Sequence, residues 1–119
     1  QRRAALTKAG ATVTVLPADA QGRVDFLAAL DHLGAVGINK VLVEAGTGIT
    51  TSVLAAALAD KIYWTQSPHI LGSDARPAVA ALKQVALPPQ NLYTQSRSLL
   101  VGQDQLRVFV KNVSADRTE

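Results

Sequence analysis

The sequence predicts a mixed α/β fold, in which a sheet is flanked by helices and closed by a β-hairpin. Two apolar, strand-like segments in the first half are separated by a stretch with helical spacing. A helix-forming stretch and a third strand-like segment follow them. The end of the chain contains two further strand-like segments around a short polar turn, which is typical of a hairpin.

The first half contains three of the expected elements. Residues 11–17 (ATVTVLP) alternate β-branched side chains up to Pro17 and predict a short strand. Residues 24–37 have apolar side chains at helical spacing, with Asp25 placed to cap the helix and Gly37 to end it. Residues 38–45 (INKVLVEA) form a continuous apolar run, which is typical of a strand covered on both faces.

The remaining elements follow from similar signals. Residues 50–60 (TTSVLAAALAD) predict a helix that begins near Thr50 to Ser52. Residues 61–72 predict a strand stopped by Pro68, and residues 73–91 a loop with a short element around 78–86. Strands at 92–101 and 105–113 then form the hairpin around GQD. The β-α-β-α-β order implies a parallel layer, to which the hairpin adds antiparallel strands.

Composition excludes several functional classes. The 119 residues suit one small domain, and 48% hydrophobic with 18% charged residues indicates a globular chain. The net charge of +3 comes from lysine and arginine residues that are scattered along the chain, and only five aromatic residues could stack on bases. No nucleic-acid binding is therefore expected. No apolar run reaches the roughly 18 residues of a membrane span, and no signal-peptide core is evident, so we expect a cytoplasmic protein. Without cysteine, and without metal-ligand spacing around either histidine, no metal site is expected.

The strand-to-helix junction in KVLVEAGTGITTSVLAAAL (40–58) is the strongest candidate site. Gly46 and Gly48 would let the backbone approach a ligand and adopt positive φ, and the free amides of the helix start would attract a phosphate. The hydroxyls of the junction add possible phosphate donors, from Thr47, Thr50, Thr51 and Ser52. Glu44 would instead accept hydrogen bonds from a neutral, donor-rich group. A purely structural turn remains open, because the pattern is neither a P-loop nor GxGxxG.

A longer stretch, residues 37–77, resembles the reductase domain of the bifunctional riboflavin biosynthesis family, which joins a pyrimidine deaminase to a pyrimidine reductase. That family has an apolar strand, Glu-Gly-Gly, a helix ending in Leu-Val-Asp-Glu, a strand, and Pro-x-x-Leu-Gly. The corresponding residues here are Val41-Leu42-Val43, Glu44-Ala45-Gly46, Leu58-Ala59-Asp60-Lys61 and Pro68-His69-Ile70-Leu71-Gly72. The resemblance covers nearly the whole chain, but only the C-terminal half of that reductase domain, so residues 1–119 are expected to be a partial domain.

The resemblance implies a dihydrofolate-reductase-like fold and a reaction. In that family NADPH reduces the ribosyl group of 5-amino-6-(5-phosphoribosylamino)uracil, a pyrimidine ribose phosphate, to the ribityl form. It implies that Glu44 binds the substrate, and it leaves the catalytic residues unassigned. It places the NADPH phosphates on Gly46, Thr47, Gly48, Ile49, Thr50, Thr51 and Ser52.

The resemblance also implies a homodimer, through the sheet or the closing hairpin. Because the front half of the site lies outside these residues, the isolated chain is expected to be inactive. Two positions depart from the family pattern. Ala45 replaces a glycine and would cost about 1 kcal/mol if positive φ were required there. Lys61 replaces an acid and is expected to change only a surface pair.

Two other functions stay open on the sequence. One is a dihydrofolate-reductase-like enzyme that reduces a different substrate. The other is a non-catalytic α/β module with a structural or oligomerising role.

Overall fold

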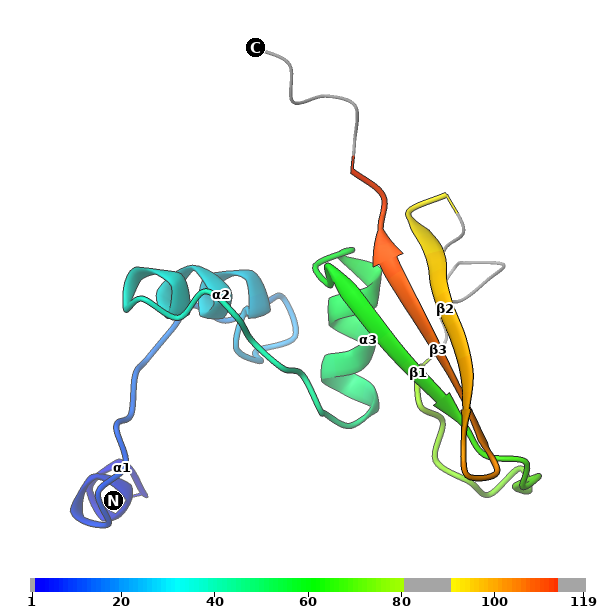
Figure 1. Cartoon of the computed structure of the whole chain (residues 1–119). Coiled ribbons are helices and arrows are strands. Elements are labelled where there is room, and N and C mark those ends of the chain that lie inside the picture. The colour runs from blue at the N-terminus through cyan, green and yellow to red at the C-terminus, as the bar shows by residue number, and fades with distance from the viewer. Residues whose placement is uncertain (1, 81–90, 114–119) are drawn as a thin grey trace. The chain divides into compact units, whose positions relative to one another are not determined.

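A computed structural model describes residues 2–80 and 91–113 of the chain (Figure 1). Its elements in chain order are α1 (Arg2–Lys8), α2 (Phe26–Ala35), α3 (Thr47–Ala55), β1 (Lys61–Gln66), β2 (Tyr93–Val101) and β3 (Asp104–Lys111). The chain divides into two compact units, Gln1–Leu42 and Val43–Glu119. Residues 44–52, which include every candidate site residue, therefore lie within the second unit. The short element expected around 78–86 falls largely outside the described residues.

The first unit contains α1 and α2. The expected caps of α2 are confirmed: the Asp25 carboxylate accepts a hydrogen bond of 3.1 Å from the amide of Ala28. At the other end Gly37 adopts φ +88°, and the amide of Ile38 donates to the carbonyl of Leu33 at 2.9 Å. The α1 helix, formed by RRAALTK, was not predicted from the sequence.

The strand predicted at 11–17 is wrong. Residues 11–17 pair with no described strand, and the only described bridge nearby joins Ala18 to Val24 across the turn at Gly22. Val15 is 74% exposed, so the alternating pattern has no sheet partner against which to bury. A β-pattern forms a strand only where a second backbone satisfies its amides and carbonyls.

The strand predicted at 38–45 is also wrong for the described residues. The segment is extended but unpaired, and Val41, Leu42 and Val43 are 44%, 78% and 37% exposed. A strand that is apolar on both faces requires neighbours on both edges and cover on both sides. The sheet that the structure describes provides neither for this segment.

The second unit is built on an antiparallel sheet with the order β1-β3-β2 among the described residues. The hairpin prediction is confirmed: Val101 pairs with Asp104 across a two-residue turn, in which Gly102 adopts φ +64°. The strand at 61–66 is confirmed too, and it ends before Pro68. The expected parallel layer is wrong, because both described pairings are antiparallel. Helices together with a sheet remain consistent with an α/β class.

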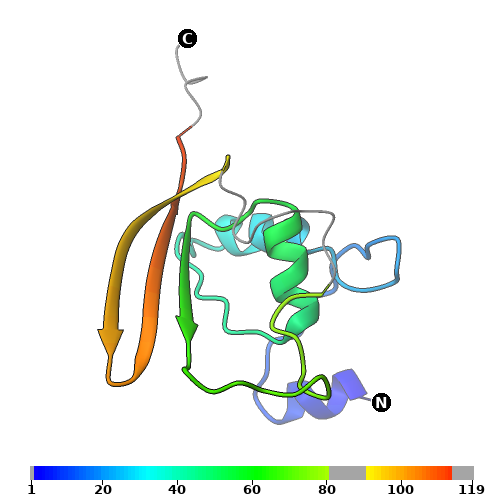
Figure 2. The ribbon, with the colours of Figure 1, turned by 90° about the vertical axis from the view of Figure 1, so that its right-hand side faces the viewer.

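Two long side chains attach the sheet to the connection between α3 and β1. The Tyr93 hydroxyl donates to the carbonyl of Ala59 at 2.8 Å, and Lys111 Nζ donates to the carbonyl of Ala57 at 2.7 Å. Tyr93 and Lys111 are directly opposite in the β2–β3 register, so α3 ends on the face of the sheet that carries both. Figures 1 and 2 show α3 running antiparallel to β1, so α3 begins at the end of the unit where β1 stops.

The core of the second unit is small. Its buried side chains are those of Val53 and Leu54 in α3, Tyr93 in β2 and Val108 in β3. None of the described hydrophobic side chains is completely shielded from solvent. Among the described residues, moreover, no helix is long and apolar enough to cross a membrane.

Candidate functional site: the start of α3

At the junction the backbone changes from an extended conformation directly into the α3 helix. Gly46 is the N-cap, with φ −71° and ψ 175°, and Thr47 is the first helical residue. The helix thus begins three residues before the predicted Thr50. Gly48 and Ile49 therefore belong to the first turn of α3 and not to a loop, whereas Thr51 lies one turn further along.

The predicted positive φ at the two glycines is wrong. Gly46 has a negative φ, and the positive-φ glycines of the described residues do not include Gly48. Ala45 likewise adopts no positive φ, so the strain expected from its β-carbon does not arise. What the glycines provide is space, because a β-carbon built on Gly46 or Gly48 meets no atom within 4 Å. The main chain at the helix start is therefore open to a ligand.

The first amides of α3 have no protein partner among the described residues. A helix leaves its first amides without intrahelical acceptors, and a side chain at the N-cap usually satisfies one of them. Gly46 has no side chain to do so, and the first main-chain bond of the helix runs from Thr50 to Gly46 at 3.2 Å. The amides of Thr47, Gly48 and Ile49 are left at the positive end of the helix dipole, where an anion is stabilised.

The hydroxyl groups of the junction are already committed as donors. Thr50 donates to the carbonyl of Ala45 at 3.0 Å, and Thr51 to that of Thr47 at 2.6 Å. Ser52 donates to the carbonyl of Gly48 at 3.1 Å. In this arrangement the expected phosphate-donor role of the hydroxyls is not supported, and the donors that the junction offers are main-chain amides.

The loop after β1 returns to the first turns of α3. The Thr47 hydroxyl donates to the carbonyl of Pro77, and the amide of Ala80 donates to the Thr51 hydroxyl at 2.9 Å. These two contacts join residues about thirty positions apart in the chain and hold the helix start against the 77–80 segment. The sequence offered no signal for them, since they depend on the path of the loop.

Glu44 lies two residues before the N-cap and is exposed. Its carboxylate makes no ion pair or hydrogen bond with the described residues. A free carboxylate therefore precedes a group of free amides on one short segment. The two can accept and donate hydrogen bonds to different parts of one ligand.

Arg107, on β3, is a charged residue that was not predicted to belong to a site. Its side chain is half-buried, and its buried Nε has no hydrogen-bond partner among the described residues. The signal was present in QLRVFV, where one charged residue interrupts an apolar strand. Within the described part of the chain, no group of three acidic, histidine or cysteine residues is placed to hold a metal ion.

Comparison with known proteins identifies the family of this chain. The family model of the RibD C-terminal domain matches residues 1–107. The chain therefore belongs to the RibD C-terminal domain family. It is similar to the riboflavin biosynthesis protein RibD of Escherichia coli (strain K12), with 33% identity over 93 residues. That match covers 76% of this chain and 25% of the relative, so the chain spans about a quarter of the length of that protein.

Proposed function

We propose that this chain provides the cofactor-phosphate junction and one substrate-binding carboxylate of an NADPH-dependent pyrimidine reductase in riboflavin biosynthesis. The proposed reaction is the reduction of the ribosyl group of 5-amino-6-(5-phosphoribosylamino)uracil to the ribityl form. Membership of the RibD C-terminal domain family and the similarity to the riboflavin biosynthesis protein RibD support this proposal. The observation that carries it is the uncapped, open start of α3 three residues after Glu44.

The residues of the junction fit a dinucleotide phosphate. The amides of Thr47, Gly48 and Ile49 donate to phosphate oxygens, and the helix dipole adds to their attraction for negative charge. Gly46 and Gly48 keep β-carbons away from the approaching group. The second turn, Thr50 to Ser52, supports the first by hydrogen bonds to its carbonyls and to that of Ala45.

Glu44 has a separate role in the proposal. Its exposed carboxylate accepts hydrogen bonds from the donor-rich substrate and orients the sugar beside the cofactor. NADPH, when bound, supplies the hydride. This chain contributes binding and orientation, and we assign no acid–base residue to it.

The proposal includes a dihydrofolate-reductase-like sheet. The exposed apolar side chains at 41–43 support this part of the proposal, because further elements of such a fold would cover them.

The experiment is a calorimetric titration of the intact protein with NADPH, on the wild type and on Gly46→Ala. Because Gly46 has ordinary φ and an open β-carbon position, alanine is accommodated without strain and the fold is preserved. The added methyl group lies where the phosphate would approach, so we expect NADPH to bind at least about tenfold more weakly, a loss of about 1.4 kcal/mol.

Gly34→Ala is the matched control. Gly34 lies in α2, also with negative φ and an open β-carbon position, and its substitution should leave the affinity unchanged. As a second arm, Glu44→Gln should raise KM for the pyrimidine substrate while the NADPH affinity stays at the wild-type value. Equal NADPH affinities for Gly46→Ala and Gly34→Ala would refute the phosphate role of the junction.

A further inference from the structure

Arg107 has the hydrogen-bonding pattern of a group that lacks its main partner. Nη2 donates to the side-chain oxygen of Gln66 at 3.1 Å, and the guanidinium lies 6.0 Å from the centroid of the Phe109 ring. The Nε group is buried and makes no hydrogen bond with the described residues. An arginine remains charged at any physiological pH, and a buried donor without a partner is costly.

No carboxylate compensates this charge in the described part of the chain. The ion pair there joins Arg23 to Asp19, in the other unit. Residues 75–103 contain no aspartate or glutamate at all. Asp104 precedes Arg107 on the same strand by three positions, so strand alternation directs it to the opposite face. The guanidinium therefore has an uncompensated charge and, on its two Nη atoms, the uncommitted N–H groups to receive an anion.

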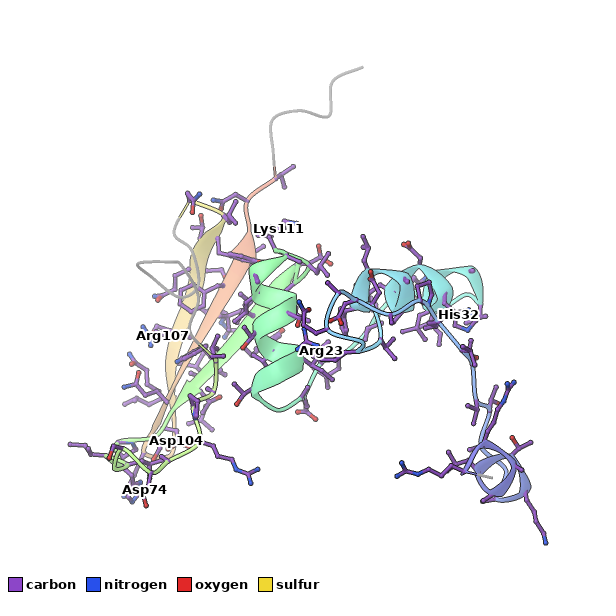
Figure 3. The ribbon with its side chains drawn as sticks, turned by 180° about the vertical axis from the view of Figure 1, so that it is seen from behind. Arg23, His32, Asp74, Asp104, Arg107 and Lys111 are labelled. Carbon is purple, nitrogen blue, oxygen red and sulfur yellow. The ribbon has the colours of Figure 1, made fainter. Side chains whose placement is uncertain are left out.

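The position of Arg107 relates it to the start of α3. Arg107 is opposite Trp64 in the β1–β3 register, two residues before β1 ends at Gln66. By alternation it shares a face with Lys111, whose side chain reaches the end of α3. Since α3 runs antiparallel to β1, Arg107 lies toward the end of the unit where α3 begins, and Figure 3 shows it on β3 away from Lys111.

We propose that Arg107 is an anion-recognition residue that takes a phosphate group of a ligand bound at the start of α3. Gln66 holds the guanidinium by one hydrogen of Nη2, which leaves the other N–H groups of Nη1 and Nη2 for phosphate oxygens. This proposal rests on the proposed function, which supplies two phosphate sources: the cofactor and the pyrimidine ribose phosphate. The role of Arg107 extends the proposed function, because it adds a side chain that lies more than fifty residues after the junction in the sequence.

The test measures both phosphate sources on the intact protein. Arg107→Met keeps an apolar stem but removes the charge and all donors. NADPH affinity is measured by calorimetry, and KM for the pyrimidine substrate by NADPH oxidation. We expect one of the two constants to rise at least about tenfold, because a charged hydrogen bond is lost. A rise in the NADPH constant alone assigns the anion to the cofactor, and a rise in KM alone assigns it to the substrate.

Arg97→Met is the matched control. Arg97 lies on the adjacent β2, is exposed, and is opposite Val108, so its side chain lies on the other face. We expect both constants for Arg97→Met to stay within about twofold of the wild type, since a surface charge contributes little. The affinity of the wild type for the ligand that Arg107 binds should also fall more steeply with added KCl than the affinity of Arg107→Met for that ligand.

Arg107→Lys tests the proposal where Arg107→Met fails to fold. Lysine keeps the charge and the stem but lacks the planar fork, so it should weaken the same constant by severalfold. Unchanged constants for both Arg107 variants, or values equal to those of Arg97→Met, would overturn the proposal. If Arg107→Met weakens NADPH binding while Gly46→Ala does not, Arg107 binds the anion and the junction does not. The reverse result retains the junction and rejects Arg107.

Discussion

Replacing Ala57 by glycine is expected to stabilise the protein, because Ala57 occupies a position that glycine fills elsewhere in the chain. Each helix ends with the same pattern, in which the second amide past the cap donates to a carbonyl five residues earlier. These pairs are Ala11 with Leu6, Ile38 with Leu33, and Leu58 with Val53. The residue between cap and donor has positive φ in all three: Gly10 at +88°, Gly37 at +88° and Ala57 at +49°.

The magnitude follows from two opposing effects. A non-glycine residue in the left-handed region costs about 1–2 kcal/mol, which Ala57→Gly would recover. Glycine also has more conformational freedom in the unfolded chain, which lowers the stability by about 0.4–1 kcal/mol. The expected net gain is about 0.5–1 kcal/mol. The hydrogen bond from Lys111 Nζ to the Ala57 carbonyl persists, since it uses the main chain.

The assay is urea unfolding of the intact protein, in which Ala57→Gly should raise the midpoint without changing the slope. Ala56→Gly is the matched control. Ala56 adopts φ −88°, so glycine relieves no strain there and should lower the midpoint through the unfolded chain alone. A lower midpoint for both variants would refute the reasoning, because it would mean that the backbone at Ala57 is unstrained.

Two further predictions concern the caps and the core. Asp25→Ala should lower the unfolding free energy by about 1 kcal/mol in urea titrations, because the amide of Ala28 loses its acceptor, whereas Asp25→Asn should be nearly neutral. Burial, and secondly the charge of Asp60, raise the pKa of Tyr93 above its usual 10.0. The folded state then holds this proton more tightly than the unfolded chain. The contribution of Tyr93 to stability should be constant below about pH 10 and fall as the pH rises through the raised pKa, and Tyr93→Phe should remove this part of the alkaline decline.

The elements that could be predicted from the sequence are those set by neighbouring residues. The α2 helix has its cap, its apolar spacing and its terminal Gly37 within one short stretch. The hairpin needs only two β-rich segments and Gly102. The end of β1 follows from Pro68, which cannot donate to a ladder. In each case the information lies within a few positions of the structure that it specifies.

The two wrong strands show the opposite situation. Residues 11–17 and 38–45 have strand-like patterns, yet a pattern does not supply a partner backbone. Their exposed side chains, Val15 and Leu42 above all, have no sheet to cover them in the described residues. Strand prediction therefore fails where pairing depends on segments far away in the chain.

The position of the junction was predictable from the sequence, whereas its detailed structure was not. A strand-like run, an acid and two glycines indicate a ligand junction near Gly46 from local signals. The actual start of α3 at Thr47 depends on the Gly46 backbone, and the contacts with Pro77 and Ala80 depend on the path of the loop. The position of Arg107 relative to the junction follows only from the register of the sheet, in which Arg107 is opposite Trp64.

The departure of Ala45 from the Glu-Gly-Gly pattern does not weaken the proposed site, because its donors are main-chain amides. Those amides point out of the first turn whatever side chains the helix carries, and they require only that no β-carbon fill the approach. Ala45 has ordinary φ and contributes its carbonyl, which accepts the Thr50 hydroxyl at 3.0 Å. In the proposed site Gly46 is the position where an added methyl group would meet the phosphate, and Ala45 is not. The Gly46→Ala titration therefore tests the N-cap position and not the residue before it.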